Sequence, residues 1–112
     1  MNQTPPIEID VQSVKKRMEG DENLLLLDVR EPSEYDTAKI DGSTFIPMAT
    51  LPQRVGELEA DLDRPIVVHC HHGGRSLQVT QWLRERGFTR VQNMSGGIQA
   101  WSEQVDASVP TY

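Results

Sequence analysis

Short apolar runs alternate with segments of helical periodicity along the chain, and this alternation constrains the fold more than any other feature. The runs Leu24–Val29 and Ile66–His69 have the length and composition of strands buried on both faces of a sheet. Shorter runs of the same kind occur at Ile7–Ile9, Phe45–Ile46 and Val91–Met94. Strands that alternate with helices are typical of an α/β domain, so we expect a mostly parallel sheet.

The segments between these runs have apolar residues at helical spacing. Asp10 is a candidate N-cap for a helix that ends at Gly20. We predict further helices over Leu51–Leu62, Ser76–Arg86 and Gly97–Gln104.

With 112 residues the chain is long enough for one hydrophobic core and too short for two ordinary domains. We therefore expect one domain over residues 1–112, with its core at about 7–104 and a C-terminal tail at 105–112. No apolar run approaches the roughly 20 residues that span a bilayer. The segment Met1–Asp10 does not have the pattern of a secretory signal, so we expect a cytoplasmic protein.

The formal net charge is −6, which argues against long-range attraction to nucleic acids or anionic membranes. A small anionic substrate would therefore need a locally positive site. The segment around Cys70 is the candidate, because His69, His71 and His72 flank this single cysteine and Arg75 follows.

Cys70 comes directly after a predicted strand and shortly before a predicted helix. In parallel sheets, ligands bind at the carboxyl ends of the strands. Gly73 and Gly74 permit backbone conformations that are closed to other residues, so successive N–H groups can turn inward and form an anion-binding nest. The first turn of the helix adds unpaired N–H donors and the positive end of its dipole.

A thiol in such a nest loses its proton more easily than a free thiol, whose pKa is about 8.5. The same donors would stabilise a persulfide anion, and the Arg75 guanidinium could bind an oxyanion such as a thiosulfonate. The alternative is that Cys70 is an inert core cysteine and the glycines only form a turn.

The histidines and two residues of the earlier strand have supporting interpretations. His69 is expected to be a packed neighbour, whereas His71 and His72 either aid substrate binding or are tolerated loop residues. A metal site is disfavoured, because consecutive residues cannot all face one ion. Asp28 could accept hydrogen bonds from the Cys70 loop and Arg30 could pair with Glu34; a purely structural pairing is the favoured interpretation of both.

Three segments together resemble the rhodanese family. Leu27–Tyr35 looks like the first signature of that family, Cys70–Ser76 like its active loop, and Ser95–Trp101 like its C-terminal signature. They occur in the family order with fitting spacing. The resemblance covers Ile7–Trp101, nearly the whole chain.

The resemblance implies a parallel five-stranded sheet with helices on both faces. It also implies a sulfurtransferase whose cysteine, Cys70, takes sulfur from thiosulfate or a persulfide, holds it as a persulfide, and passes it to cyanide or to a thiol, which could belong to a protein. No metal or organic cofactor is implied. The substrate-binding residues would be His71, His72, Gly73, Gly74, Arg75 and Ser76, with Asp28 and Arg30 as supporting residues.

Two other functions stay open at this point. A phosphatase or arsenate reductase of similar fold has five residues between the cysteine and the arginine, and this chain has four between Cys70 and Arg75. Arsenate reduction would also require a second thiol. A non-catalytic binding module is the other alternative, although such a module would be expected to lose the cysteine.

Overall fold

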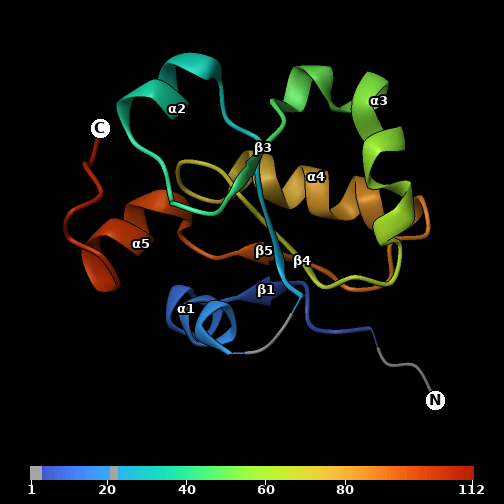
Figure 1. Ribbon diagram of the computed structural model, residues 1–112, viewed down its shortest axis with the longest axis horizontal. Coiled ribbons are helices and arrows are strands. Elements are labelled where there is room, and N and C mark those ends of the chain that lie inside the picture. The colour runs from blue at the N-terminus through green and yellow to red at the C-terminus, as the bar shows by residue number, and fades with distance from the viewer. Residues whose placement is uncertain (1–3, 21–22) are drawn as a thin grey trace.

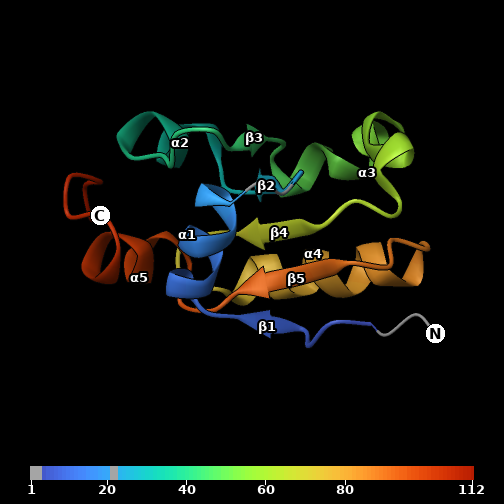
Figure 2. The same ribbon diagram turned by 60° about the horizontal axis from the view of Figure 1, so that its bottom comes forward.

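The computed structural model describes residues 4–20 and 23–112, and its centre is a parallel sheet of five strands in the order β1-β5-β4-β2-β3. The strands are β1 (Glu8–Ile9), β2 (Leu25–Asp28), β3 (Thr44–Phe45), β4 (Ile66–His69) and β5 (Val91–Met94). In Figure 2 the arrows of β1, β5 and β4 point the same way. The expected parallel five-stranded sheet is confirmed.

Helices cover both faces of this sheet (Figure 1). The α-helices are α1 (Val11–Glu19), α2 (Pro32–Thr37), α3 (Leu51–Arg54), α4 (Gly74–Glu85) and α5 (Gly97–Gln104). Two 3₁₀ segments, η1 (Met48–Thr50) and η2 (Val55–Asp61), flank α3. No helix of the described residues is long and apolar enough to cross a membrane.

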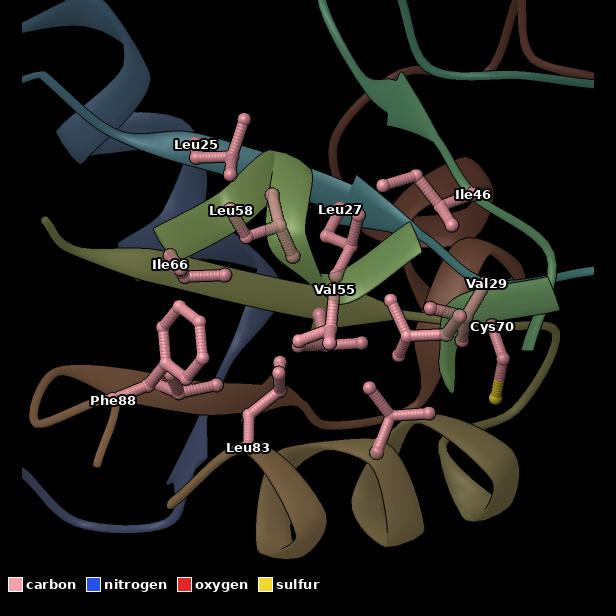
Figure 3. Packing of buried hydrophobic residues seen from close by; sticks show 14 residues of the cluster. Leu25, Leu27, Val29, Ile46, Val55, Leu58, Ile66, Cys70, Leu83 and Phe88 are labelled. Carbon is pink, nitrogen blue, oxygen red and sulfur yellow. The ribbon is translucent and has the colours of Figure 1, made fainter. Parts of the chain in front are cut away.

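The continuous apolar runs of β2 and β4 feed two separate hydrophobic cores. Successive side chains of a strand point to opposite faces. Leu27 packs under α3 and α4 (Figure 3), and Val68 belongs to the same cluster. Leu26 and Val67 pack under α1 and α5. Because both faces are covered, every residue of these two strands is buried. This accounts for runs that lack the alternation of a half-exposed strand.

The structure differs from the sequence expectation in the segment Leu51–Leu62. One α-helix was expected there, but α3 ends at Arg54 and η2 continues as a 3₁₀ helix. Val55 and Leu58 are three residues apart, which fits three residues per turn, and both are buried. Leu62 lies beyond the turn and is exposed.

The helix α2 was not expected, although its signals are present in the sequence. Pro32 occupies the start of the helix, and the Glu34 side chain accepts a hydrogen bond from the backbone N–H of Glu31 at 3.0 Å. These are the features of a capped N-terminus. α2 matters for function because it carries Glu34.

The last residues, 105–112, form no helix or strand, but they pack against the rest of the domain. Val109 is buried in the core of α1 and α5, and the Ser102 hydroxyl donates to the Val109 carbonyl. This attachment returns the chain to the carboxyl end of the sheet, where Tyr112 reaches the loop that follows β4.

Candidate active site

Cys70 follows β4, a central strand with β5 on one side and β2 on the other. The loop after it turns into α4, which begins at Gly74, slightly earlier than expected. The expected arrangement of strand, tight loop and helix is therefore present. Figure 3 shows the Cys70 sulfur turned toward α4.

Three hydrogen-bond donors surround the Cys70 sulfur. The backbone N–H of Gly73 lies 3.2 Å from Sγ, the backbone N–H of Ser76 3.4 Å, and the Ser76 hydroxyl 3.3 Å. Gly73 has a φ of +116°, a conformation that side chains disfavour, whereas Gly74 begins α4 without a positive φ. Of the two glycines, Gly73 therefore supplies the special backbone of the turn.

The ionisation of Cys70 is set by two opposing influences. Burial acts to raise the pKa of the thiol, because an anion is poorly solvated away from water. Hydrogen bonds from Ser76, from the Gly73 N–H and from the His72 backbone favour the thiolate and together hold the pKa below its ordinary value. Cys70 is only 1% exposed.

The residues that hold these donors form the floor of the loop, which we define as Gly73, Ser76 and Asn93. The Ser76 hydroxyl has a single proton, which it shares between Sγ and the Asn93 side-chain oxygen. The Asn93 amide nitrogen donates to the Gly73 carbonyl at 3.1 Å and to the Glu8 carboxylate at 3.0 and 3.1 Å. Since both of these partners only accept, the amide oxygen must face Ser76.

Asn93 was not expected at the site. It lies on β5, next to β4, where the sequence predicts only a short strand. The available signal was its polarity within a strand whose four residues are all buried. A buried amide needs hydrogen-bond partners, and here the loop provides them.

The helix α5 supports the loop from behind. The backbone N–H groups of Ile98 and Gln99 donate to the carbonyls of Cys70 and His71 at 2.9 and 3.1 Å. Gly97 has a φ of +60°, and a Cβ there would lie 2.6 Å from the Cys70 carbonyl oxygen and also against that of His71. A glycine is required for this close approach, which explains one residue of the segment Ser95–Trp101.

Around the mouth of the loop lies a charged and aromatic rim, which we define as Glu34, His71, Arg75 and Tyr112. The Arg75 guanidinium donates to both carboxylate oxygens of Glu34, at 2.6 and 2.9 Å. Tyr112 donates its hydroxyl to the same carboxylate at 2.8 Å and stacks on the His71 ring at 4.0 Å. The Arg75 pair holds the pKa of Glu34 down at about 2, so this carboxylate is ionised near neutrality.

The two supporting residues are placed differently from one expectation. Asp28 was expected to accept hydrogen bonds from the Cys70 loop, and Arg30 to pair with Glu34. Instead the fully buried Arg30 guanidinium pairs with Asp28 at 2.7 Å, and it reaches only the backbone carbonyl of Glu34, at 3.3 Å. A buried cation needs a counterion, and Asp28, two residues earlier, supplies it. The favoured structural interpretation of these two residues agrees with this geometry.

The histidines divide into buried and exposed members. His69 is completely buried, and burial lowers its pKa to about 4, so it is neutral near pH 7. Burial also lowers the pKa of His71, whereas His72 is exposed and stacks on His71 at 3.9 Å. Within residues 4–20 and 23–112, no group of three His, Cys, Asp or Glu side chains is placed to hold a metal ion.

Comparison with protein families gives one match that covers most of the chain. The family model described as a rhodanese-like domain matches residues 10–104. This range includes all three segments singled out in the sequence, and it ends just before the segment 105–112.

Known relatives fall into short and long proteins. A sulfurtransferase of Allochromatium vinosum is 38% identical over 95 residues, which are 85% of this chain and 87% of that protein. The Arabidopsis thaliana chloroplastic rhodanese-like/PpiC domain-containing protein 12 is 36% identical over 113 residues, and the match spans only 38% of its length. Among solved structures, the human single-domain sulfurtransferase TSTD1 is 25% identical with a TM-score of 0.77, covering 89% of this chain and 98% of that one.

Proposed function

The chain belongs to the rhodanese-like domain family, and from this premise we propose that it transfers sulfane sulfur through a persulfide on Cys70. The observation that carries the proposal is the set of three hydrogen-bond donors around the Cys70 sulfur. Such donors stabilise a thiolate as a nucleophile and then a persulfide anion in the same place. A reducing compartment such as the cytoplasm would keep this thiol free.

In the first half of the reaction the Cys70 thiolate would attack the outer sulfur of a donor such as thiosulfate. The sulfur–sulfur bond of thiosulfate breaks, and sulfite leaves with the bonding electron pair. A new sulfur–sulfur bond forms on Cys70, whose outer sulfur keeps one negative charge. The N–H groups of Gly73 and Ser76 donate to Sγ, one bond away from this charge, so they would also stabilise it.

In the second half an acceptor would attack the outer sulfur of the persulfide. Cyanide leaves as thiocyanate, and a thiolate leaves as a new persulfide. The Cys70 thiolate is restored with its electron pair, so the cycle needs neither an oxidant nor a reductant. Among the loop residues proposed to bind substrate, only Ser76 is buried, so a donor would meet the others first: His72 and Gly74 are exposed, and His71, Gly73 and Arg75 are partly exposed.

The burial of Cys70 favours a second candidate, a non-catalytic binding module. A thiol with 1% exposure reacts only if the loop admits a donor. Alkylation of the native protein by iodoacetamide measures this directly. Slow alkylation, limited by the rate of global unfolding, would support the binding module.

The proposed function is tested by incubating the protein with thiosulfate and measuring its intact mass. We expect the wild type to gain one sulfur atom, to lose it when cyanide is added, and to release thiocyanate. The Cys70→Ala variant should gain nothing, while Thr89→Ala should behave like the wild type, because Thr89 is exposed and donates to the Leu62 carbonyl before β5, away from the sulfur. No gain from thiosulfate or from an organic persulfide would contradict the proposal.

A further inference from the structure

We infer that Glu34 is a specificity-determining residue that selects sulfur donors by charge, disfavouring dianionic donors relative to monoanionic ones. The inference rests on the proposed sulfur transfer at Cys70 and names the class of donor that this site prefers. It follows from the placement of one carboxylate on the guanidinium that an anionic donor would otherwise bind.

Glu34 is held in place by donors from three parts of the chain. Both of its oxygens accept from Arg75, at 2.6 and 2.9 Å, and one also accepts the Tyr112 hydroxyl at 2.8 Å. The backbone N–H of Glu31 donates to it at 3.0 Å. Its side chain is 16% exposed, against 36% for Arg75, so the carboxylate is the more enclosed partner. A donor must therefore displace or share a well-anchored anion to use Arg75.

Other basic side chains at this end of the sheet also offer little positive charge to an anionic donor. Arg30 is fully buried and paired with Asp28, so it presents no charge to a donor. Burial keeps the pKa of His71 low, which leaves this ring neutral near pH 7. The whole chain has a formal net charge of −6. The mouth of the loop thus offers an anion hydrogen-bond donors but little uncompensated positive charge.

Electrostatic repulsion from one fixed carboxylate acts in proportion to the charge of the donor. At the same place, the repulsion energy of a dianion is twice that of a monoanion. If removal of the carboxylate raises kcat/KM for the monoanion by some factor, it should therefore raise kcat/KM for the dianion by the square of that factor. Thiosulfate and methanethiosulfonate form a matched pair of probes. Both present an outer sulfur on an SO₂ or SO₃ group, release sulfite or methanesulfinate, and differ by one negative charge.

The test compares kcat/KM for the two probes in the wild type, in Glu34→Gln and in Glu57→Gln. Glu57 pairs with Arg54 on the surface, so its variant changes the net charge equally without touching the rim. For Glu34→Gln we expect a gain of roughly tenfold with thiosulfate and roughly threefold with methanethiosulfonate. For Glu57→Gln we expect the ratio of the two probes to stay as in the wild type.

A second variant covers the case in which Glu34→Gln fails to fold. Tyr112→Phe keeps the ring that stacks on His71 but removes one anchor of the carboxylate, so it should shift the ratio toward thiosulfate by a smaller factor. Three results would overturn this inference but leave the proposed function standing. They are an unchanged ratio of kcat/KM between the two probes in both variants, a loss of kcat/KM that is larger for thiosulfate, and an equal change of the ratio in Glu57→Gln. If the wild type takes sulfur from neither probe, this inference fails, and if an organic persulfide also gives no gain of sulfur, the proposed function fails with it.

Discussion

The floor and the rim both contact the loop that follows Cys70, but they are built from different chemistry. The floor consists of neutral groups, and its two side chains are buried, with Ser76 at 0% and Asn93 at 2% exposure, while Gly73 is partly exposed. The rim consists of ionised and aromatic groups that water reaches, with Arg75 at 36% and Tyr112 at 39%.

This difference indicates a division of labour. Neutral donors in a buried place act at short range on one atom and are insensitive to salt, so they suit control of the sulfur's ionisation. Exposed charges act at longer range and are screened by ions, so they suit selection of the molecule that approaches. Substitutions in the floor should therefore change the ionisation of the Cys70 sulfur. Substitutions in the rim should change the choice of donor and leave that ionisation unchanged.

The largest effect is expected from Gly97→Ala, which attacks the support beneath the floor. The new Cβ would lie 2.6 Å from the Cys70 carbonyl oxygen, and the residue would have to keep a φ of +60°. The contact is with backbone, which cannot rotate away, so we expect unfolding to become easier by about 3 kcal/mol. Urea unfolding measures this loss, and iodoacetamide alkylation should show a more reactive or more exposed Cys70.

Gly74→Ala is the matched control for this change. Gly74 is also the first residue of a helix beside the loop, but no atom lies within 4 Å of its Cβ position and its φ is not positive. Alanine should be neutral or slightly stabilising there. Equal losses in both variants would show that flexibility of the glycines, rather than the close approach of α5, supports the floor.

The floor was more predictable from the sequence than the rim, because its main parts are local. Cys70, Gly73 and Ser76 occur within seven residues, between an apolar run and an amphipathic segment. That local pattern determines a strand, a tight turn and a helix start, and hence the direction of the N–H groups. The same locality explains why the strands of the sheet were predicted well.

The partners that come from distant parts of the chain were missed. Glu34 precedes Arg75 by 41 positions and is one of 17 acidic residues, so nothing in the sequence selects it as the partner. Asn93 depends on β5 lying next to β4, and Tyr112 depends on the burial of Val109. Only the packed structure brings these side chains together. The pairing of Arg30 is a separate case, because its counterion Asp28 is only two residues away. The sequence left Glu34 as an alternative to a purely structural pairing, and burial of the guanidinium selects Asp28.

The next largest effect is expected from Ser76→Ala, which removes one donor from the floor. The Ser76 hydroxyl and N–H both favour the thiolate, and alanine keeps only the N–H. Loss of a hydrogen bond worth about 1 kcal/mol should lower the ionisation constant of the Cys70 thiol by roughly fivefold. The absorbance of the thiolate, followed as a function of pH, should show a higher pKa of Cys70 than in the wild type.

Two outcomes would contradict this expectation. An unchanged titration of Cys70 in Ser76→Ala would mean that the backbone donors alone control the ionisation of the sulfur. A changed ratio of kcat/KM between thiosulfate and methanethiosulfonate would mean that the floor also affects the choice of donor.

The smallest effect is expected when the rim is titrated with acid. The pKa of Glu34 is lowered from 4.5 to about 2 by Arg75, so the pair stabilises the fold above pH 4.5 and this contribution is lost as the pH falls toward 2. The pair is partly exposed, so we expect Glu34→Gln to lower the free energy of unfolding by about 0.5–1 kcal/mol at pH 7. The difference in free energy of unfolding between Glu34→Gln and the wild type should decrease from pH 4.5 to the lowest pH at which both still fold, as measured by urea unfolding at each pH. Glu57→Gln breaks a pair of similar hydrogen-bond geometry that is more exposed, so its loss of stability relative to the wild type should be smaller. Equal losses of stability in Glu34→Gln and Glu57→Gln would mean that the hydrogen bonds to Glu34 stabilise it no more than an ordinary surface pair. The Glu34 carboxylate would then be held too loosely to select donors by charge.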